Sequence, residues 1–150
     1  MSATLFDEHR EIQASADAFL AALRETPRVP AKIHQLRAQL AKQMNRHRLS
    51  EEALIVGPFK AAGGFEHHPE ILDLMQTIRK GWMSYSEHVR HWTPQAIEAD
   101  WDGYAAAVEH RVEALRSFTA MEEREIYAPM LRFLERGAAA KPAGMHATLR

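Results

Sequence analysis

The chain contains no cysteine among its 150 residues. Disulfide bonds, thiolate metal ligands and cysteine nucleophiles are therefore excluded, and any metal ion has to be held by histidine, aspartate and glutamate. An excess of either charge is also missing, because 19 Lys+Arg stand against 20 Asp+Glu and the basic residues are scattered. Since a phosphate backbone attracts clustered basic residues, we expect no nucleic acid partner.

Long apolar runs are absent too. The chain starts with polar and acidic residues where a secretory signal would be basic and then apolar. Nowhere does it carry the roughly 18–20 consecutive apolar residues that a membrane span needs. We therefore expect a soluble, cytoplasmic protein with no membrane partner.

Strand-like alternation is the third absence, and apolar residues instead recur at helical spacing in four segments. The expected helices run from Ala3 or Thr4 to Arg24, from Ala31 to Val56, from Pro69 to about Val89, and from Ala99 or Tyr104 to Leu134. Short connections between long helices favour antiparallel neighbours. The predicted fold class is all-α, an antiparallel up-down-up-down four-helix bundle.

The predicted bundle is one domain spanning residues 1–136. Residues 59–68 contain a glycine pair and are expected to form a loop. Pro129 is expected to kink or end the last helix. Residues 137–150 have small and polar side chains with no apolar face, so we expect a poorly ordered C-terminal tail.

Two twelve-residue stretches resemble each other. HRLSEEALIVGP begins at His47, and FTAMEEREIYAP begins at Phe118. Both have glutamates at the fifth and sixth places, isoleucine at the ninth and proline at the twelfth, but only the first begins with histidine. Their positions on the second and fourth expected helices hint at a duplicated helical hairpin.

His47 and Glu51, at the first and fifth places, lie on one face of a helix and about one turn apart. That face is the apolar one, and a buried carboxylate has to be hydrogen-bonded, protonated or metal-bound. If the chain turns near residue 28, His9 lies opposite His47, and the repeat adds Glu122. We predict a metal site made of these four residues: His9, His47, Glu51 and Glu122. Imidazole with carboxylate suits iron, manganese or zinc.

The opposite side of this predicted site is apolar. A turn near residue 63 places Ile78 at the same level, and Phe118 replaces histidine in the second copy. His88 is only an outside candidate, because it lies about ten residues, or roughly 15 Å, beyond that level. The four ligands can serve one ion, whereas a second ion would have the carboxylates alone.

With the repeat and its histidines in view, the sequence resembles the hemerythrin-like, HHE cation-binding family over roughly residues 5–134. The resemblance implies a four-helix bundle with a non-haem di-iron centre. It also implies that His9 and His47 bind one iron, while Glu51 and Glu122 take bridging positions. The family's histidines for the other iron would fall near Ile78 and at Phe118, and this chain lacks both.

Other polar groups have plainer explanations. Glu52 and Glu123 are rotated about 100° from their inward neighbours, so we expect both in solvent. Glu66, His67, His68 and Glu70 could form a surface metal site, but a helix start with acidic residues in its first turn explains the glutamates. A phosphorelay domain is disfavoured because no histidine has the HxxKG setting.

The expected function follows from the half-complete site. No phosphate-binding loop or nucleophile elbow is present, so we name no catalytic residue and expect a protein that is not an enzyme. The leading hypothesis is a metal-binding or sensing protein whose iron, one or two ions, responds to oxygen, nitric oxide or redox state. The alternative is a metal-free bundle that regulates an unknown protein partner through hydrogen-bonded polar residues. A weaker third hypothesis is a di-metal oxidase or peroxidase.

Overall fold

The computed structural model describes residues 2–140. This part of the chain is all-helical and contains no strand, as predicted. None of the helices in it is long and apolar enough to cross a membrane.

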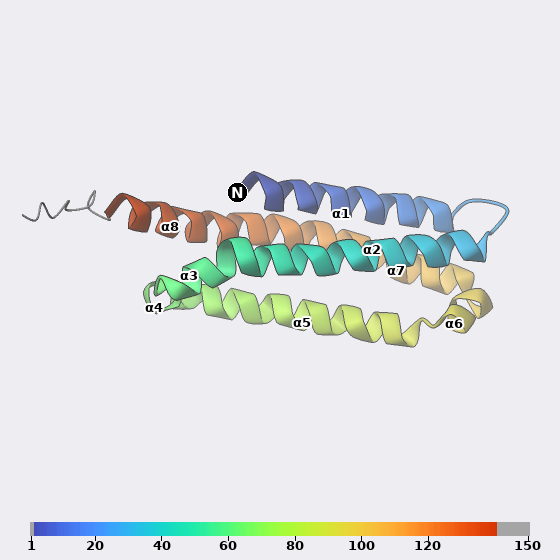
Figure 1. Cartoon of the computed structure of the whole chain (residues 1–150). Coiled ribbons are helices and arrows are strands. Elements are labelled where there is room, and N and C mark those ends of the chain that lie inside the picture. Colours follow the sequence, from blue (N-terminus) through green and yellow to red (C-terminus); the bar gives the residue numbers. More distant parts are fainter. Residues whose placement is uncertain (1, 141–150) are drawn as a thin grey trace, which may run out of the picture.

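Five α-helices longer than eight residues make up most of the structure: α1 (Ser2–Leu23), α2 (Pro30–Glu51), α5 (Pro69–His91), α7 (Trp101–Glu122) and α8 (Ala128–Ala140). Three are shorter: α3 (Gly57–Ala61), α4 (Gly64–His67) and α6 (Pro94–Ala99). Figure 1 shows α1, α2, α5 and the α7–α8 run lying side by side, with α3 and α4 at one end and α6 at the other.

The helix starts follow from local chemistry. Proline occupies the first turn of α2, α5 and α6, where its missing N–H removes no helical hydrogen bond. Before α6, the Thr93 hydroxyl accepts a 3.1 Å hydrogen bond from the Ala96 N–H, and the Asp100 carboxylate accepts one of 3.0 Å from the Gly103 N–H to start α7. These caps satisfy backbone donors that have no intrahelical partner.

Two apolar clusters form the core. One packs α1, α2, α6 and α7 together through Phe19, Leu23, Ile33, Ile97, Trp101 and Tyr104, among others. The other lies toward the opposite end and includes Leu5, Ile55, Phe59, Ile71, Ile126, Tyr127 and Met130. Polar side chains of α1, α2 and α7 are buried between these clusters.

Both copies of the repeat widen into a five-residue π-helix at the same places: η1 (Glu52–Val56) and η2 (Glu123–Tyr127). At their ends, the Gly57 N–H bonds to the Glu52 carbonyl and the Ala128 N–H to the Glu123 carbonyl, each five residues back. A proline follows in each copy, and a proline ring clashes with the carbonyl four residues earlier in a regular α-helix. The wider turn accommodates that ring, so the helix continues through Pro129.

Three expectations about helix limits need correction. Residues 59–68 are largely helical, since α3 and α4 leave only a short turn between them. Pro129 does not end the helix, and α8 continues to Ala140, beyond the expected limit at residue 136. The rest of the predicted tail, 141–150, lies outside the described residues.

Candidate metal centre

Three polar residues from three helices converge between the two apolar clusters. His9 of α1, His47 of α2 and Glu122 of α7 are 2%, 6% and 5% exposed. One ligand atom from each lies within 4.8 Å of the other two, and the imidazole centroids are 4.5 Å apart. Among residues 2–140 no other group of this kind is formed by histidine, aspartate or glutamate. These are three of the four predicted ligands.

The fourth predicted ligand, Glu51, stands slightly apart. Its Oε2 lies 3.7 Å from Nε2 of His47, which is too long for a hydrogen bond. The same oxygen accepts a 2.9 Å hydrogen bond from the Tyr127 hydroxyl. Glu51 is thus joined to the other three through a tyrosine.

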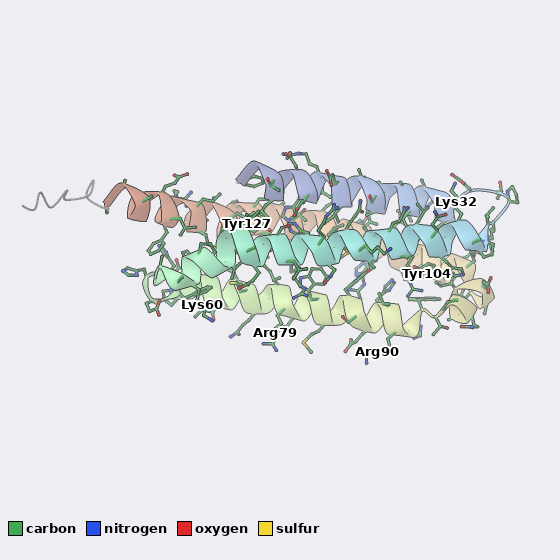
Figure 2. All side chains as sticks on the ribbon, viewed as in Figure 1. Lys32, Lys60, Arg79, Arg90, Tyr104 and Tyr127 are labelled. Atoms are coloured by element: carbon green, nitrogen blue, oxygen red, sulfur yellow. The ribbon has the colours of Figure 1, made fainter. Side chains whose placement is uncertain are left out.

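Tyr127 occupies the middle of the cluster and is fully buried. Besides Glu51, its hydroxyl oxygen lies 3.1 Å from Oε1 of Glu122, 3.2 Å from Nε2 of His47 and 3.4 Å from Nε2 of His9. Figure 2 shows Tyr127 among the long helices. Tyr127 was not among the predicted site residues, yet its hydroxyl contacts all four of them.

The π-helix η2 explains why Tyr127 was missed. In an α-helix, residues five apart point about 140° away from each other. In a π-helix the backbone bonds from i to i+5, so Glu122 and Tyr127 share a face. The only available signal was the proline at the twelfth place of each repeat, which is incompatible with a regular helix passing through it.

Each buried imidazole also has a carboxylate on its other ring nitrogen. Nδ1 of His9 donates to Oε1 of Glu123 at 2.9 Å, and Nδ1 of His47 donates to Oε2 of Glu8 at 2.7 Å. The Ser50 hydroxyl donates to Glu8 at 2.9 Å and holds it in place. Glu8 was not among the predicted site residues, and Glu123, expected in solvent, is partly buried against His9.

Glu123 is partly covered because α1 lies against it, and the π-helix is not the cause. Its side chain is only 33% exposed, because it accepts a hydrogen bond from Nδ1 of His9 on α1. Glu52, the equivalent residue in the first copy, is exposed as predicted. The two copies therefore differ in the exposure of their sixth residue as well as in the identity of their first.

The inner atoms of the cluster are short of protons. An ionised carboxylate accepts hydrogen bonds only, and an imidazole that donates through Nδ1 presents a lone pair at Nε2. Nε2 of His9 nevertheless lies 3.0 Å from Oε1 of Glu122. Among the described residues, the Tyr127 hydroxyl offers the one proton to four acceptors. The cluster requires added protons or a cation.

The pKa directions match this shortage. Burial raises the pKa of Glu51 to about 7, and the neighbouring Glu122 charge also raises it. Burial opposes protonation of His9, but hydrogen bonds to Glu122 and Glu123 outweigh it, so the His9 pKa is raised. Burial lowers the pKa of His47. Burial and the charges of Glu122 and Glu51 raise the Tyr127 pKa strongly, so its hydroxyl stays protonated.

Phe118 lines a cavity together with His9, His47, Glu51 and Glu122. Ile78 of α5 is 7% exposed, and a Cβ atom at Gly81 would lie 3.0 Å from the Phe118 ring, so α5 and α7 touch there. His88 is not part of the cluster; its ring stacks 5.9 Å from the ring of Tyr104, in the direction of α6.

The site thus consists of two imidazoles, two carboxylates and a phenol, with two outer carboxylates that orient the imidazoles. Its apolar side offers no further ligand among the described residues. No family model, curated protein or solved structure matches the chain.

Proposed function

We propose that this chain is a hemerythrin-like, up-down-up-down four-helix bundle that binds one iron ion through His9, His47 and Glu122. In this proposal it is a metal-binding or sensing protein for oxygen, nitric oxide or redox state. Glu51 is the fourth predicted ligand and lies next to the other three.

One observation carries the proposal: both buried imidazoles are held by carboxylates on Nδ1. Histidines that bind metals commonly donate their second ring N–H to a carboxylate, which fixes the tautomer and aims the other nitrogen at the ion. Glu123 does this for His9 and Glu8 does it for His47. Two histidines that merely filled the core would not both need a carboxylate on Nδ1 that turns their Nε2 atoms toward one point.

The donor set fits iron. Neutral nitrogen and anionic oxygen ligands without sulfur suit iron, with manganese and zinc as alternatives. A cation at this point would also satisfy the four acceptors that a single hydroxyl proton cannot. The apolar residues Ile78 and Phe118 support one ion, because the second half of the site has no histidine.

Bound iron would supply a redox-active centre that can take a small diatomic ligand. The protein's own contribution is to orient the ligands around the ion. Tyr127 presents an O–H donor toward the centre. Apolar side chains, among them Phe118 and Leu115, line the space next to the site.

The experiment that tests the proposal is a metal titration. Protein stripped with a chelator is reconstituted anaerobically with ferrous iron, desalted and analysed for bound metal, with manganese and zinc in parallel. We expect close to one equivalent of iron per chain. Retention of no metal would overturn the proposal, and two equivalents would contradict the half-site argument.

A second function is favoured by the raised pKa values of His9 and Glu51. If protons rather than a metal satisfy the inner acceptors, the chain is a metal-free regulatory module with an unknown protein partner. The same titration separates the two, because such a protein retains no ion and shows no rise in unfolding midpoint when metal is added.

A further inference from the structure

A cavity of about 180 Å³ extends away from the candidate metal centre between α1, α2, α5 and α7. Its walls are mainly apolar and include Ile12, Leu40, Trp82, Val112, Leu115 and Phe118. His9, His47, Glu51 and Glu122 line one end. The cavity is therefore a space for an apolar group, and its contents are a separate question from the metal.

The other end of the cavity carries two arginines. Arg37 lies ten residues before His47 on α2, and Arg111 lies eleven before Glu122 on α7. At 1.5 Å per residue, each arginine is about 15 Å along its helix from the metal-site end. Acidic groups thus line one end and guanidinium groups the other.

Neither guanidinium is paired with a carboxylate within residues 2–140. Arg111 donates to the carbonyl and hydroxyl of Ser84, at 3.0 and 2.9 Å, and Arg37 donates to the carbonyl of Val89 at 2.8 Å. Both arginines therefore reach the same segment of α5 from opposite neighbours. Each guanidinium has five N–H donors, so most of this donor capacity is not used by these bonds.

His88, on the same segment of α5, reports the local field. Burial lowers its pKa to about 4, and the positive charges of Arg111 and Arg37 lower it too. A positive potential in a partly buried, apolar space attracts an anion much more strongly than one in water does. The charged end of a ligand would therefore lie beside the arginines.

We propose that this cavity binds a small amphipathic carboxylate, with its anionic head at Arg37 and Arg111 and its apolar body against Trp82, Leu115 and Phe118. The ligand class follows from the cavity's shape and charge. A cavity of roughly 150 Å³ holds a benzene molecule, so this one suits an apolar body of about six to ten carbons. In the metal-free protein, the glutamates at the metal-site end disfavour a carboxylate there and fix the ligand's direction.

Calorimetric titration with octanoate tests the proposal, with 1-octanol as the uncharged ligand of equal length. Chelator-treated protein is used so that the carboxylate cannot bind to a metal. We expect octanoate to bind at least about tenfold more tightly than octanol, because a charge-assisted hydrogen bond contributes about 1.5–3 kcal/mol. Equal affinities would overturn the proposal.

Variants of the cavity residues test where the carboxylate head and the apolar body of the ligand bind. Arg37→Gln and Arg111→Gln should each weaken octanoate binding about tenfold and leave octanol binding unchanged. Arg90→Gln is the matched control, since Arg90 points away from the other helices on the exposed face of α5 (Figure 2). Leu115→Trp fills the cavity and should weaken both ligands. An Arg90→Gln effect equal to that of Arg37→Gln would contradict the assignment.

A spectroscopic readout covers the case in which an arginine variant fails to fold. In the unsubstituted protein, octanoate should raise the pKa of His88 above about 4, and octanol should leave it in place. NMR titration of the histidine ring protons measures this directly. An unchanged His88 pKa at saturating octanoate would place the ligand elsewhere and overturn the proposal.

Discussion

The two copies of the repeat aim the same glutamate at one centre but surround it with different groups. In the first copy, histidine stands one α-helical turn before Glu51, and apolar Val56 follows at the tenth place. In the second, Phe118 stands before Glu122, and Tyr127 takes the tenth place. The polar partner therefore precedes the glutamate in the first copy and follows it in the second.

This difference changes the chemistry of each half. Nε2 of His47 is a lone-pair donor that can hold a metal ion, whereas the Tyr127 hydroxyl is a hydrogen-bond donor at physiological pH. The first copy therefore supplies a ligand and the second supplies a proton. A site built this way is asymmetric even though its backbone is repeated, since η1 and η2 occupy the same places.

The largest expected effect comes from removing the histidine of the first copy. His47→Ala should weaken iron binding more than about 100-fold, because loss of an orienting partner alone costs 10–100-fold. The metal-free protein should also lose about 1–3 kcal/mol, since Glu8 and Tyr127 lose a buried partner. Metal analysis and urea unfolding measure the two effects.

Two controls accompany His47→Ala. Phe118→Leu changes the first place of the second copy and should keep the metal content. His110→Ala removes an exposed imidazole of α7 and should change neither quantity. If Phe118→Leu lowers the metal content as much as His47→Ala, the two copies do not differ as described.

Removing the hydroxyl of the second copy should have the next largest effect. Tyr127→Phe leaves Glu51 and Glu122 without their shared donor, and we expect a loss of about 1–3 kcal/mol of stability. Tyr104→Phe is the control, because no hydrogen bond to its hydroxyl is formed within residues 2–140. Equal unfolding midpoints for the two variants would show that the Tyr127 hydroxyl does not connect the cluster.

The sixth place of the repeat gives a more subtle comparison. Glu123→Gln keeps the shape but weakens the charge-assisted bond to Nδ1 of His9, so iron affinity should fall about 10–100-fold. Glu52→Gln, at the same place in the first copy, should leave it unchanged, because Glu52 is exposed. Competition with a coloured chelator gives both constants. A similar loss in both variants would show that iron affinity depends on the total negative charge nearby and not on the bond to His9.

The smallest effect is a titration difference. In metal-free protein, the pKa of His9 should lie above 6.5 and that of His47 below it. Protonated His9 stabilises the fold below pH 6.5, and this contribution is lost as the pH rises through its folded pKa. His47 has the opposite effect, because its pKa is lower in the folded chain than in the unfolded chain. As the pH falls below 6.5, the unfolded chain is protonated first, so the free energy of unfolding decreases. NMR ring signals test this, and two pKa values on the same side of 6.5 would contradict it.

Much of the arrangement could be predicted because it depends on helical periodicity. The apolar stripes predicted an all-helical chain, and counting residues back from the turn near residue 28 placed His9 opposite His47. Tyr127 could not be found in this way, since the count assumes an α-helix through η2. Glu123 was missed because its partner, His9, lies on another helix. Glu8 was missed for another reason: it precedes His9 and reaches across to α2, which depends on side-chain packing rather than on helical phase.

The wide turn of η2 also ties the site to the core beyond it. A chain of the same length that formed a continuous α-helix through 123–127 would rotate Glu122 by about 100° relative to Met130. Met130 is fully buried in the apolar cluster. Such a chain could bury the Glu122 carboxylate beside His9 or the Met130 side chain in the apolar cluster, but not both. The wide turn is therefore what lets the chain bury both side chains at once.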